Sequence, residues 1–250
     1  MLISNLKSRD THLIGENIEI RSVAQISEVG TNQLTFCNPG HEDLIMPIGA
    51  AFVVASIAGL SRQNTYILAK NPKLEFARMM RRLYPNHIEP HISIGNNVQI
   101  HESAVIGSEG FGDIRNESGE WERFPHIGGV QLDDNVRIDA LTAVDRGSIG
   151  NTVIGEGTHI DNLVHIAHNV QIGKHCLVIA QAMIAGSVKI GDYTTIQPGA
   201  RIASQVRIGS NVIIGMGSVV IENIPDNVVV VGVPGRILRK NDESPICLQK

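Results

Sequence analysis

The chain has 250 residues with a formal net charge of −4 at pH 7, and 42% of its residues are hydrophobic and 18% charged. This length allows a sizeable core in one or two units, and the small negative charge argues against a nucleic-acid partner. Only 4% of the residues are aromatic while 25 are glycines, which favours short β-strands with tight turns over a helical bundle.

The three cysteines, Cys37, Cys176 and Cys247, lie far apart and form no CxxC pair. Their odd number and wide spacing argue against a disulfide framework and fit a reducing cytoplasm, where we expect the protein to reside. Polar residues interrupt the N-terminal segment, so we expect no signal peptide. The apolar run 48–60 is too short to span a bilayer; we expect a buried strand and turn there, and no integral membrane segment.

Residues 1–86 lack any repeat and predict a small α/β domain. Three of its segments are strand-like: HLIGENIEIRSV (12–23), AAFVVAS (50–56) and TYILAK (65–70). Residues 71–85 predict one amphipathic helix that ends before Pro85, because Asn71 suits the N-cap and Pro72 the first helical position. The apolar residues at helical spacing are Leu74, Ala77, Met80 and Leu83. A proline-rich linker follows.

A six-residue repeat dominates the rest of the chain. Every sixth residue of one long run is aliphatic, namely Ile154, Ile160, Ile166, Ile172, Val178, Ile184, Ile190, Ile196, Ile202, Ile208, Ile214 and Val220. The residue two places before each of them is small or β-branched. We expect each hexad to form one short strand and one turn, with these two side chains pointing inward.

Three hexads would close one triangular coil, with neighbouring coils about 4.8 Å apart. Earlier parts of the repeat include Leu132, Ile138 and Val144, and before them Ile94, Ile100 and Ile106. The sequence therefore predicts a solenoid over residues 91–222. Glycines follow several aliphatic positions, where we expect them to form tight corners: Gly155, Gly173, Gly191, Gly209 and Gly215.

A polar excursion, residues 107–129, interrupts the solenoid and carries Phe111, Trp121 and Pro125. Because aromatic residues are scarce elsewhere, we expect this loop to be functional; the alternative is a disordered excursion. Beyond the repeat, residues 223–250 predict a tail. Within it GRILRK (235–240) forms a short basic helix or strand, and the last ten residues fray.

Several motifs on this framework resemble a known family. GFG (110–112), VDRG (144–147), IDN (160–162) and IAHNV (166–170) occur in this order, as in the UDP-3-O-acylglucosamine N-acyltransferases of lipid A synthesis. LTFCNP (34–39) and NPKLEFARM (71–79) resemble the uridine-binding domain of the same family. The resemblance implies a mainly β fold: a left-handed parallel β-helix of hexapeptide repeats behind the small α/β domain. It also implies a homotrimer and a reaction without a metal or bound cofactor.

The resemblance implies three catalytic residues. His168 of IAHNV would be the general base, Asp161 would orient it, and Gly186 would donate its backbone N–H to the oxyanion. We expect further contacts with the nucleotide sugar from Phe36, Asn38, His41, Phe111, Trp121, Asn162, His165 and Gln205. For the acyl donor we expect contacts from Gly186, Gly215, Gly217 and Arg236.

Two departures from the family decide which donor we expect. Gln205 stands where the family has a second active-site histidine. Residues 215–240 replace the family's C-terminal helical bundle and resemble the tail of sugar acetyltransferases that use acetyl-CoA. We therefore expect an N-acyltransferase that moves an acetyl or short acyl group from acyl-CoA to a UDP-linked amino sugar in cell-surface polysaccharide synthesis. The alternative is the lipid A enzyme itself, with an acyl carrier protein as donor.

Other interpretations remain open at this stage. From its place in the hexad alone, His168 would be a solvated corner residue, and His159 and His175 are expected at the surface. A γ-type carbonic anhydrase uses the same solenoid with zinc held by three histidines, but no histidine follows His175 at the spacing that family needs. A non-catalytic scaffold or sugar-binding protein is the third class.

Overall fold

The computed structural model describes residues 1–85 and 88–242. Contacts divide the chain into two compact units: unit 1 holds residues 1–89 and 112–125, and unit 2 holds residues 90–111 and 126–250. Part of the predicted linker (86–87) and the end of the tail, including Cys247, lie outside the described residues. Among the residues described, we find no helix with the length and apolar character needed to cross a membrane.

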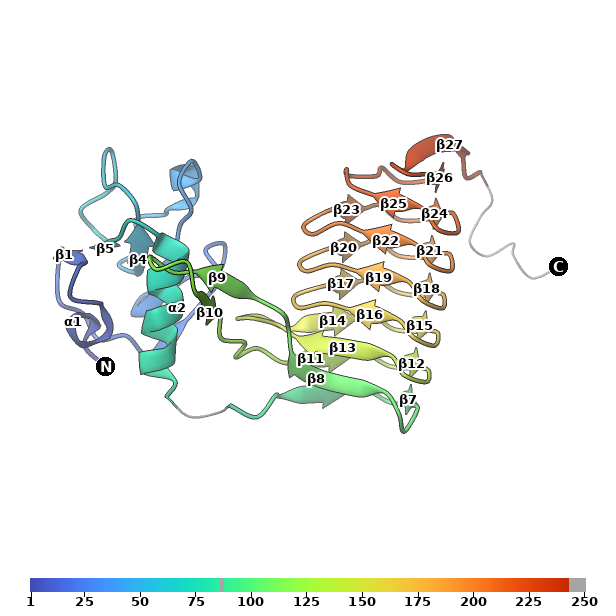
Figure 1. The fold of residues 1–250 in the computed structure, drawn as a ribbon, viewed down its shortest axis with the longest axis horizontal. Coiled ribbons are helices and arrows are strands. Elements are labelled where there is room, and N and C mark those ends of the chain that lie inside the picture. Colours follow the sequence, from blue (N-terminus) through green and yellow to red (C-terminus); the bar gives the residue numbers. More distant parts are fainter. Residues whose placement is uncertain (86–87, 243–250) are drawn as a thin grey trace. The chain divides into compact units, whose positions relative to one another are not determined.

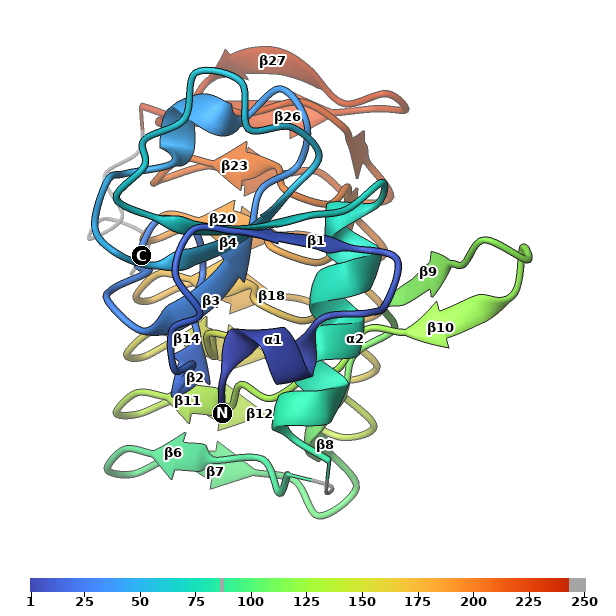
Figure 2. The ribbon, with the colours of Figure 1, turned by 90° about the vertical axis from the view of Figure 1, so that its left-hand side faces the viewer.

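Unit 1 is built on a five-stranded sheet. In spatial order its strands are β1 (His12–Ile14), β5 (Thr65–Leu68), β4 (Ala51–Val54), β3 (Gln33–Phe36) and β2 (Ser22–Val23). Only β1 runs antiparallel to its neighbour. The helix α2 (Pro72–Leu83) packs on β3 and β4 and contacts the short α1 (Ile3–Leu6), as Figure 2 shows. A single 3-10 turn, Glu42–Leu44, follows β3.

The predicted helix is confirmed. Its cap is the Asn71 side chain, which accepts a hydrogen bond from the Leu74 N–H at 3.1 Å, and Pro72 occupies the first turn. Capping of this kind satisfies an N–H that the helix itself leaves unpaired. The helix buries Phe76 and Met80 completely. Strand β3 was not among the predicted elements, although its central residues are buried.

The excursion contains an ordered β-hairpin over residues 113–123, so the disordered alternative is wrong. Strands β9 (Asp113–Arg115) and β10 (Trp121–Arg123) pair antiparallel within unit 1. Arg78 of α2 bonds Glu122 at 2.5 Å and Glu117 at 2.8 Å, and Arg81 bonds Glu122 at 2.7 Å. The Phe124 ring lies 6.1 Å from Phe76. Charge and aromatic packing thus fasten the hairpin to α2, beside which it lies in Figures 1 and 2.

Unit 2 is a solenoid of three sheets whose coil strands run parallel (Figure 1). The first sheet contains β6 (Ile92–Ile94), β11 (Val130–Leu132), β14 (Thr152–Ile154), β17 (Gln171–Ile172), β20 (Lys189–Ile190) and β23 (Arg207–Ile208). The second contains β7 (Gln99–Ile100), β12 (Arg137–Ile138), β15 (His159–Ile160), β18 (Leu177–Val178), β21 (Thr195–Ile196) and β24 (Ile213–Ile214). The third contains β8 (Val105–Glu109), β13 (Ala143–Arg146), β16 (His165–Ile166), β19 (Met183–Ile184), β22 (Arg201–Ile202) and β25 (Val219–Val220).

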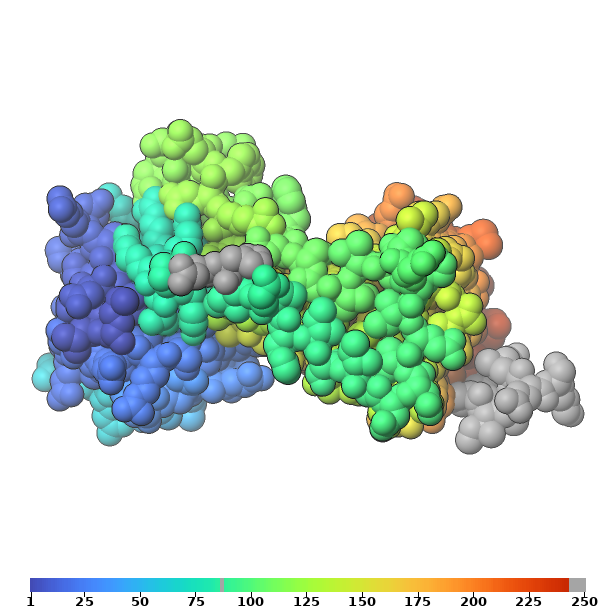
Figure 3. Space-filling model, turned by 90° about the horizontal axis from the view of Figure 1, so that it is seen from below, coloured from blue at the N-terminus to red at the C-terminus, as the bar shows by residue number. Residues whose placement is uncertain are grey.

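The hexad register is confirmed. The aliphatic residues from Ile154 to Val220 are at most 5% exposed, and the small residues two places before them, Cys176 included, are buried as well. The first coil differs, because Ile94 and Ile100 are 55% and 37% exposed. No earlier coil covers them, and Figure 3 shows this coil, in green, at the lower face of the solenoid.

The glycines after the aliphatic positions serve a different purpose from the one predicted. Gly155 does not adopt a positive φ; a Cβ built on it would lie 2.6 Å from the carbonyl carbon of Gly173 in the next coil. The left-handed conformation falls further along the turn, at residues such as His175 (φ 53°) and Asn169 (φ 59°). Glycine here therefore permits close stacking of coils, while asparagine and other residues accept the left-handed corner.

The tail forms a hairpin of strand β26 (Val228–Val231) and strand β27 (Arg236–Lys240). Strand β26 adds parallel to β24, so the hairpin extends the second sheet at the end of the repeat. This resolves GRILRK as a strand. Fraying was predicted for the last ten residues, 241–250. It is wrong for Asn241, which is buried and donates hydrogen bonds to the carbonyls of Asn227 at 2.8 Å and Asn211 at 3.0 Å, and positions 243–250 lie outside the described residues.

Candidate functional site

His168 lies in the turn that follows β16, partly buried, and its tautomer is fixed by its neighbour. Its Nδ1 lies 3.1 Å from Oδ1 of Asn169. That oxygen already accepts hydrogen bonds from the N–H and the hydroxyl of Ser148, at 2.9 and 2.7 Å. A carbonyl oxygen cannot donate, so Nδ1 of a neutral His168 carries the proton and Nε2 keeps the lone pair.

Hydrogen bonds fix both the side chain and the backbone of Asn169. Its side-chain amide donates to the Gly150 carbonyl at 3.2 Å, and its backbone N–H donates to the Thr152 hydroxyl at 2.9 Å. Its left-handed φ of 59° suits asparagine. Asn169 was not among the predicted site residues. Its place could have indicated the role, because it directly follows the candidate base at a turn position.

Two glycines, Gly186 and Gly110, lie so close to His168 that a side chain at either position would collide with it. A Cβ on Gly186 would lie 2.7 Å from both Cε1 and Nε2 of His168, and a Cβ on Gly110 would lie 3.0 Å from its Cβ. His126, only 2% exposed, packs its ring edge-on against His168 with 5.2 Å between centroids. The ring is therefore confined, with its unprotonated nitrogen facing Gly186. Gly110 and His126 belong to the excursion and were not predicted as part of this site.

Gly186 and Gln205 lie at the same corner as His168, in the next two coils toward the C-terminus. The Ser187 N–H donates to the His168 carbonyl at 2.9 Å, and the Gln205 N–H donates to the Gly186 carbonyl at 3.0 Å. In contrast, the Gly186 N–H has no acceptor among the described residues. The structure thus brings together three of the residues singled out in the sequence, one in each of three successive coils.

Asp161 and Asn162 lie at a different corner, after β15. The Asp161 carboxylate accepts from the N–H groups of Asn162 at 2.7 Å and Ala180 at 3.1 Å. Asn162 in turn accepts from the Ala140 N–H at 3.0 Å. These bonds fasten turns to one another, and the hydrogen-bond partner of His168 is Asn169 in place of the expected Asp161.

The histidine that does face a carboxylate is His165. Its Nε2 lies 3.3 Å from Oδ2 of Asp145, whose other oxygen accepts from the Ser108 hydroxyl at 2.8 Å. Asp145 is only 5% exposed. Its hydrogen bond and charge raise the pKa of His165 above the ordinary value, against the opposing effect of burial.

The predicted nucleotide-binding residues belong to unit 1. The ring of Phe36 packs 5.0 Å from Phe76 and 6.4 Å from Phe124, and it is partly exposed. Asn38 and His41 are exposed in the segment after β3. Phe36, at the end of β3, thus belongs to an aromatic cluster, and Asn38 and His41 follow it in the chain.

Phe111 and Trp121, the aromatic residues of the excursion that were predicted to contact the substrate, belong to different units. Trp121 is 62% exposed in unit 1, with the Arg115 guanidinium 4.2 Å from its ring centre. Phe111 is 86% exposed and belongs to unit 2. Each is available at a surface of its own unit.

Of the predicted acyl-donor residues, Gly186 shares a corner with His168, whereas Gly215, Gly217 and Arg236 lie elsewhere. Gly186 follows β19 in the third sheet, whereas Gly215 and Gly217 form the turn after β24 in the second sheet. Arg236 begins β27, where its guanidinium lies 3.7 Å from Glu222 and donates to the Gly235 carbonyl at 3.1 Å.

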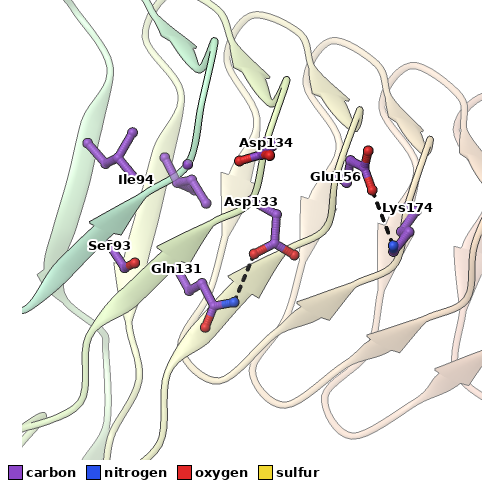
Figure 4. Close-up of a pocket in the computed structure, with 9 residues that line it drawn as sticks. Ser93, Ile94, Gln131, Asp133, Asp134, Glu156 and Lys174 are labelled. Atoms are coloured by element: carbon purple, nitrogen blue, oxygen red, sulfur yellow. Dashed lines mark hydrogen bonds and ion pairs between the residues drawn. The ribbon is translucent and has the colours of Figure 1, made fainter.

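A separate hollow lies on the first sheet, away from His168 (Figure 4). It is lined by Asp133, Asp134 and Glu156, with Lys174 bonded to Glu156 at 3.2 Å and Gln131 to Asp133 at 2.8 Å. Most of its polar groups are thus satisfied by one another. Across the part of the chain that the structure describes, no three His, Cys, Asp or Glu residues gather in a group that could hold a metal ion.

Known proteins resemble this solenoid in sequence. The model of the bacterial transferase hexapeptide (six repeats) matches residues 151–186, 171–204 and 187–222. A UDP-3-O-acylglucosamine N-acyltransferase of Shewanella denitrificans is 50% identical over 93 residues, 37% of this chain and 27% of that one. The enzyme of the same name from Methylobacterium nodulans is 51% identical over 94 residues, 38% and 26% of the two chains. The chain therefore spans only about a quarter of the length of these relatives.

Solved structures agree on the fold. The UDP-N-acetylglucosamine acyltransferase of Arabidopsis superposes with a TM-score of 0.55 at 27% identity, over 62% of this chain and 52% of that chain. The UDP-N-acetylglucosamine acyltransferase of Bacteroides fragilis superposes with a TM-score of 0.52 at 25% identity, over 62% and 58% of the two chains.

Proposed function

We propose that this chain, whose residues 151–222 carry the hexapeptide repeats of bacterial transferases, is an acyltransferase. It moves an acyl group from a thioester to the amino group of a UDP-linked amino sugar. The observation that carries the proposal is His168, with Nδ1 bonded to Asn169 and Nε2 held against Gly186. The names of the sequence relatives, all N-acyltransferases of UDP-3-O-acylglucosamine, support it.

In this proposal His168 is the general base. Acylation of nitrogen needs a group that removes a proton from the attacking amine, and imidazole suits this near pH 7. Asn169 keeps the proton on Nδ1, so the lone pair of Nε2 points at the substrate side. The orienting role expected of Asp161 passes to Asn169. No covalent intermediate with the protein is required.

We assign the oxyanion donor to the Gly186 N–H. This group has no acceptor among the described residues and sits on a rigid coil next to the base. A preorganised donor stabilises the negative oxygen of the tetrahedral intermediate without rearrangement. Gln205, one coil further, lines the same column and is proposed to contact the substrate.

For the acceptor, we propose UDP-3-O-acylglucosamine or a close analogue. The relatives' names favour the lipid A reading over our expectation of a short acyl group from acetyl-CoA, which rested on the tail and on Gln205. Unit 1, with Phe36, Asn38 and His41, is proposed to bind the nucleotide. A homotrimer and donor contacts from Gly215, Gly217 and Arg236 remain part of the proposal.

The test is an acyl-transfer assay with the purified protein. The acceptors are UDP-3-O-acylglucosamine and other UDP- and dTDP-linked amino sugars, and the donor is either acetyl-CoA or 3-hydroxyacyl carrier protein. We expect N-acylation of the UDP-3-O-acylglucosamine. His168→Ala should lower kcat by at least about 100-fold, because a positioned base contributes roughly that much. The control is His159→Ala, an exposed histidine on β15, which should retain activity. Absence of acyl transfer with every pair would overturn the proposal, and activity only with acetyl-CoA would restore the first expectation.

A further inference from the structure

Asp145 and His165 form a carboxylate–imidazole pair that the proposed base does not use. Asp145 is buried on β13, close to the end of the strand, and His165 is the outward residue of β16, with its side chain 49% exposed. The pair is 3.3 Å apart, and Ser108 fixes the other carboxylate oxygen at 2.8 Å. A buried carboxylate that holds one nitrogen of an exposed imidazole leaves the second nitrogen to face outward.

The surroundings leave that second nitrogen available. The residues that pair with His165 across the sheet, Ala143 and Met183, carry no charge. Nδ1 of His165 has no hydrogen-bond partner within residues 1–85 and 88–242. The charged and titratable groups on the elements around it are Asp145, Arg146, Glu109, Arg201 and His168. Of these Arg146 is buried against Glu109 at 3.0 Å, and Arg201 stands two strands away on β22.

His165 lies on β16, and His168 lies in the turn directly after that strand. Both imidazoles therefore belong to one coil, His165 on the inner strand β16 of the third sheet and His168 at the corner that follows it. Each has one nitrogen fixed by a protein oxygen, Asp145 for His165 and Asn169 for His168. The other nitrogen of His168 faces Gly186 in the next coil, whereas that of His165 belongs to a half-exposed side chain. The coil therefore carries two oriented proton acceptors.

Acylation of an amine requires two proton acceptors. An amino sugar has a pKa near that of an α-amino group, about 8, so it arrives at neutral pH mainly as an ammonium. Two protons must leave the nitrogen, one before attack and one from the tetrahedral intermediate. The departing thiolate takes up only one of them. An acyl transfer to a hydroxyl, which loses one proton, has no such need.

We propose that His165, held by Asp145, accepts the first proton from the substrate ammonium, while His168 accepts the second. The proposal rests on the proposed function and names a further catalytic residue for it. Nδ1 of His165 takes the proton, directly or through one water, and the imidazolium is stabilised by Asp145. The elevated pKa of His165 fits a group that gains a proton during the reaction.

Acyl transfer then proceeds through a tetrahedral intermediate. The freed amine lone pair attacks the thioester carbon, a C–N bond forms, and the carbonyl π pair moves to oxygen. His168 Nε2 removes the second nitrogen proton. The electron pair on the oxyanion then re-forms the C=O bond as the C–S bond breaks with its own pair on sulfur, and His168 returns that proton to the thiolate. The products are amide and thiol, and His165 releases the first proton to water.

The test compares the pH dependence of kcat at saturating acceptor for wild type and His165→Gln. At about pH 7 we expect the variant to be about 10- to 100-fold slower, since it lacks the acceptor for the ammonium proton. At about pH 9.5 the substrate is already a neutral amine, so the two rates should agree within about 3-fold. His168→Ala should be slow at both pH values. The matched control is His159→Gln, the outward histidine of the preceding strand, which should follow wild type.

The outcomes separate this inference from the proposed function. A wild type without any acyl transfer would defeat the proposed function. An active wild type with a His165→Gln loss that is equal at all pH values, or no loss at all, would defeat the inference alone, because a merely structural role does not depend on the ionisation of the substrate.

A second readout does not use activity. Asp145 raises the pKa of His165, so NMR titration of the labelled imidazole should give a lower pKa in Asp145→Asn than in wild type. An unchanged pKa would show that the pair is not coupled and would overturn the inference.

Discussion

At the residue scale, the position of the His168 ring depends on two glycines, Gly186 and Gly110, because a side chain at either would collide with it. His168 is confined because Gly186 and Gly110 leave room for its ring and no more. Sequence reasoning found His168 and Gly186 through a motif and a repeat length, since both are properties of the chain order. It did not find Asn169 or His126 as partners, because hydrogen bonds and ring contacts between turns carry no fixed spacing in the sequence.

Gly186→Ala tests this confinement. The new Cβ would lie 2.7 Å from Nε2 of His168, and the ring tip would move more readily than the backbone. Since a displacement of about 1 Å costs roughly 100-fold in rate, we expect kcat to fall about that much. The free energy of unfolding should fall by about 1 to 3 kcal/mol, because Gly186 is buried and the added methyl group overpacks the site. Steady-state kinetics and urea unfolding measure the two effects.

The control for Gly186→Ala is Ser204→Ala, at the same turn position one coil higher, where a side chain is already accommodated. It should alter neither quantity. Full activity in Gly186→Ala would mean that the position of the ring does not matter, and would count against His168 as the base.

At the element scale, the strands of the solenoid were predictable and the hairpin of the excursion was not. A six-residue period is a local signal that repeats, so every copy supports the others. The hairpin is defined by Arg78 and Glu122, which are 44 residues apart in the chain, and by Phe124 against Phe76. Such pairings are chosen by tertiary structure, which a single sequence does not reveal.

The β9–β10 hairpin should become less stable at acidic pH. Hydrogen bonds from Arg78, and then from Arg81, lower the pKa of Glu122 to about 2. A carboxylate whose pKa is depressed on folding stabilises the protein above its unfolded pKa, and this stabilisation is lost as pH falls toward the folded pKa. For Glu122 the window runs from about 4.5 to about 2.

Glu122→Gln should therefore reduce the stability of the hairpin at pH 7 by about 1 to 2 kcal/mol, a typical range for charged hydrogen bonds that are partly exposed. The difference from wild type should shrink as pH falls through that window. Hydrogen exchange of residues 113–123 measures it, with Glu120→Gln on the same hairpin as the control. A difference that persists at pH 2 would refute the assignment.

At the scale of the whole molecule, a solenoid is a one-dimensional stack in which each coil contacts only its neighbours. Central coils are covered on both sides, whereas the first coil is covered on one. This explains why Ile184 is fully buried and Ile94, in the equivalent inward position of a strand, is 55% exposed. The sequence placed both residues in the same register, and the pattern alone could not tell where the stack begins.

The same substitution should therefore have unequal effects along the stack. Ile184→Ala removes buried methyl groups and leaves a cavity between covered coils, so we expect a cost of about 2 to 5 kcal/mol. Ile94→Ala removes a side chain that is already half in solvent, and we expect less than about 1 kcal/mol. Native-state hydrogen exchange should show the Ile184→Ala loss greatest in β16, β19 and β22, because nearest neighbours share the interface. Equal costs at the two positions would contradict the argument from unequal burial of the coils. A loss spread evenly over all coils would mean that the solenoid unfolds as one unit.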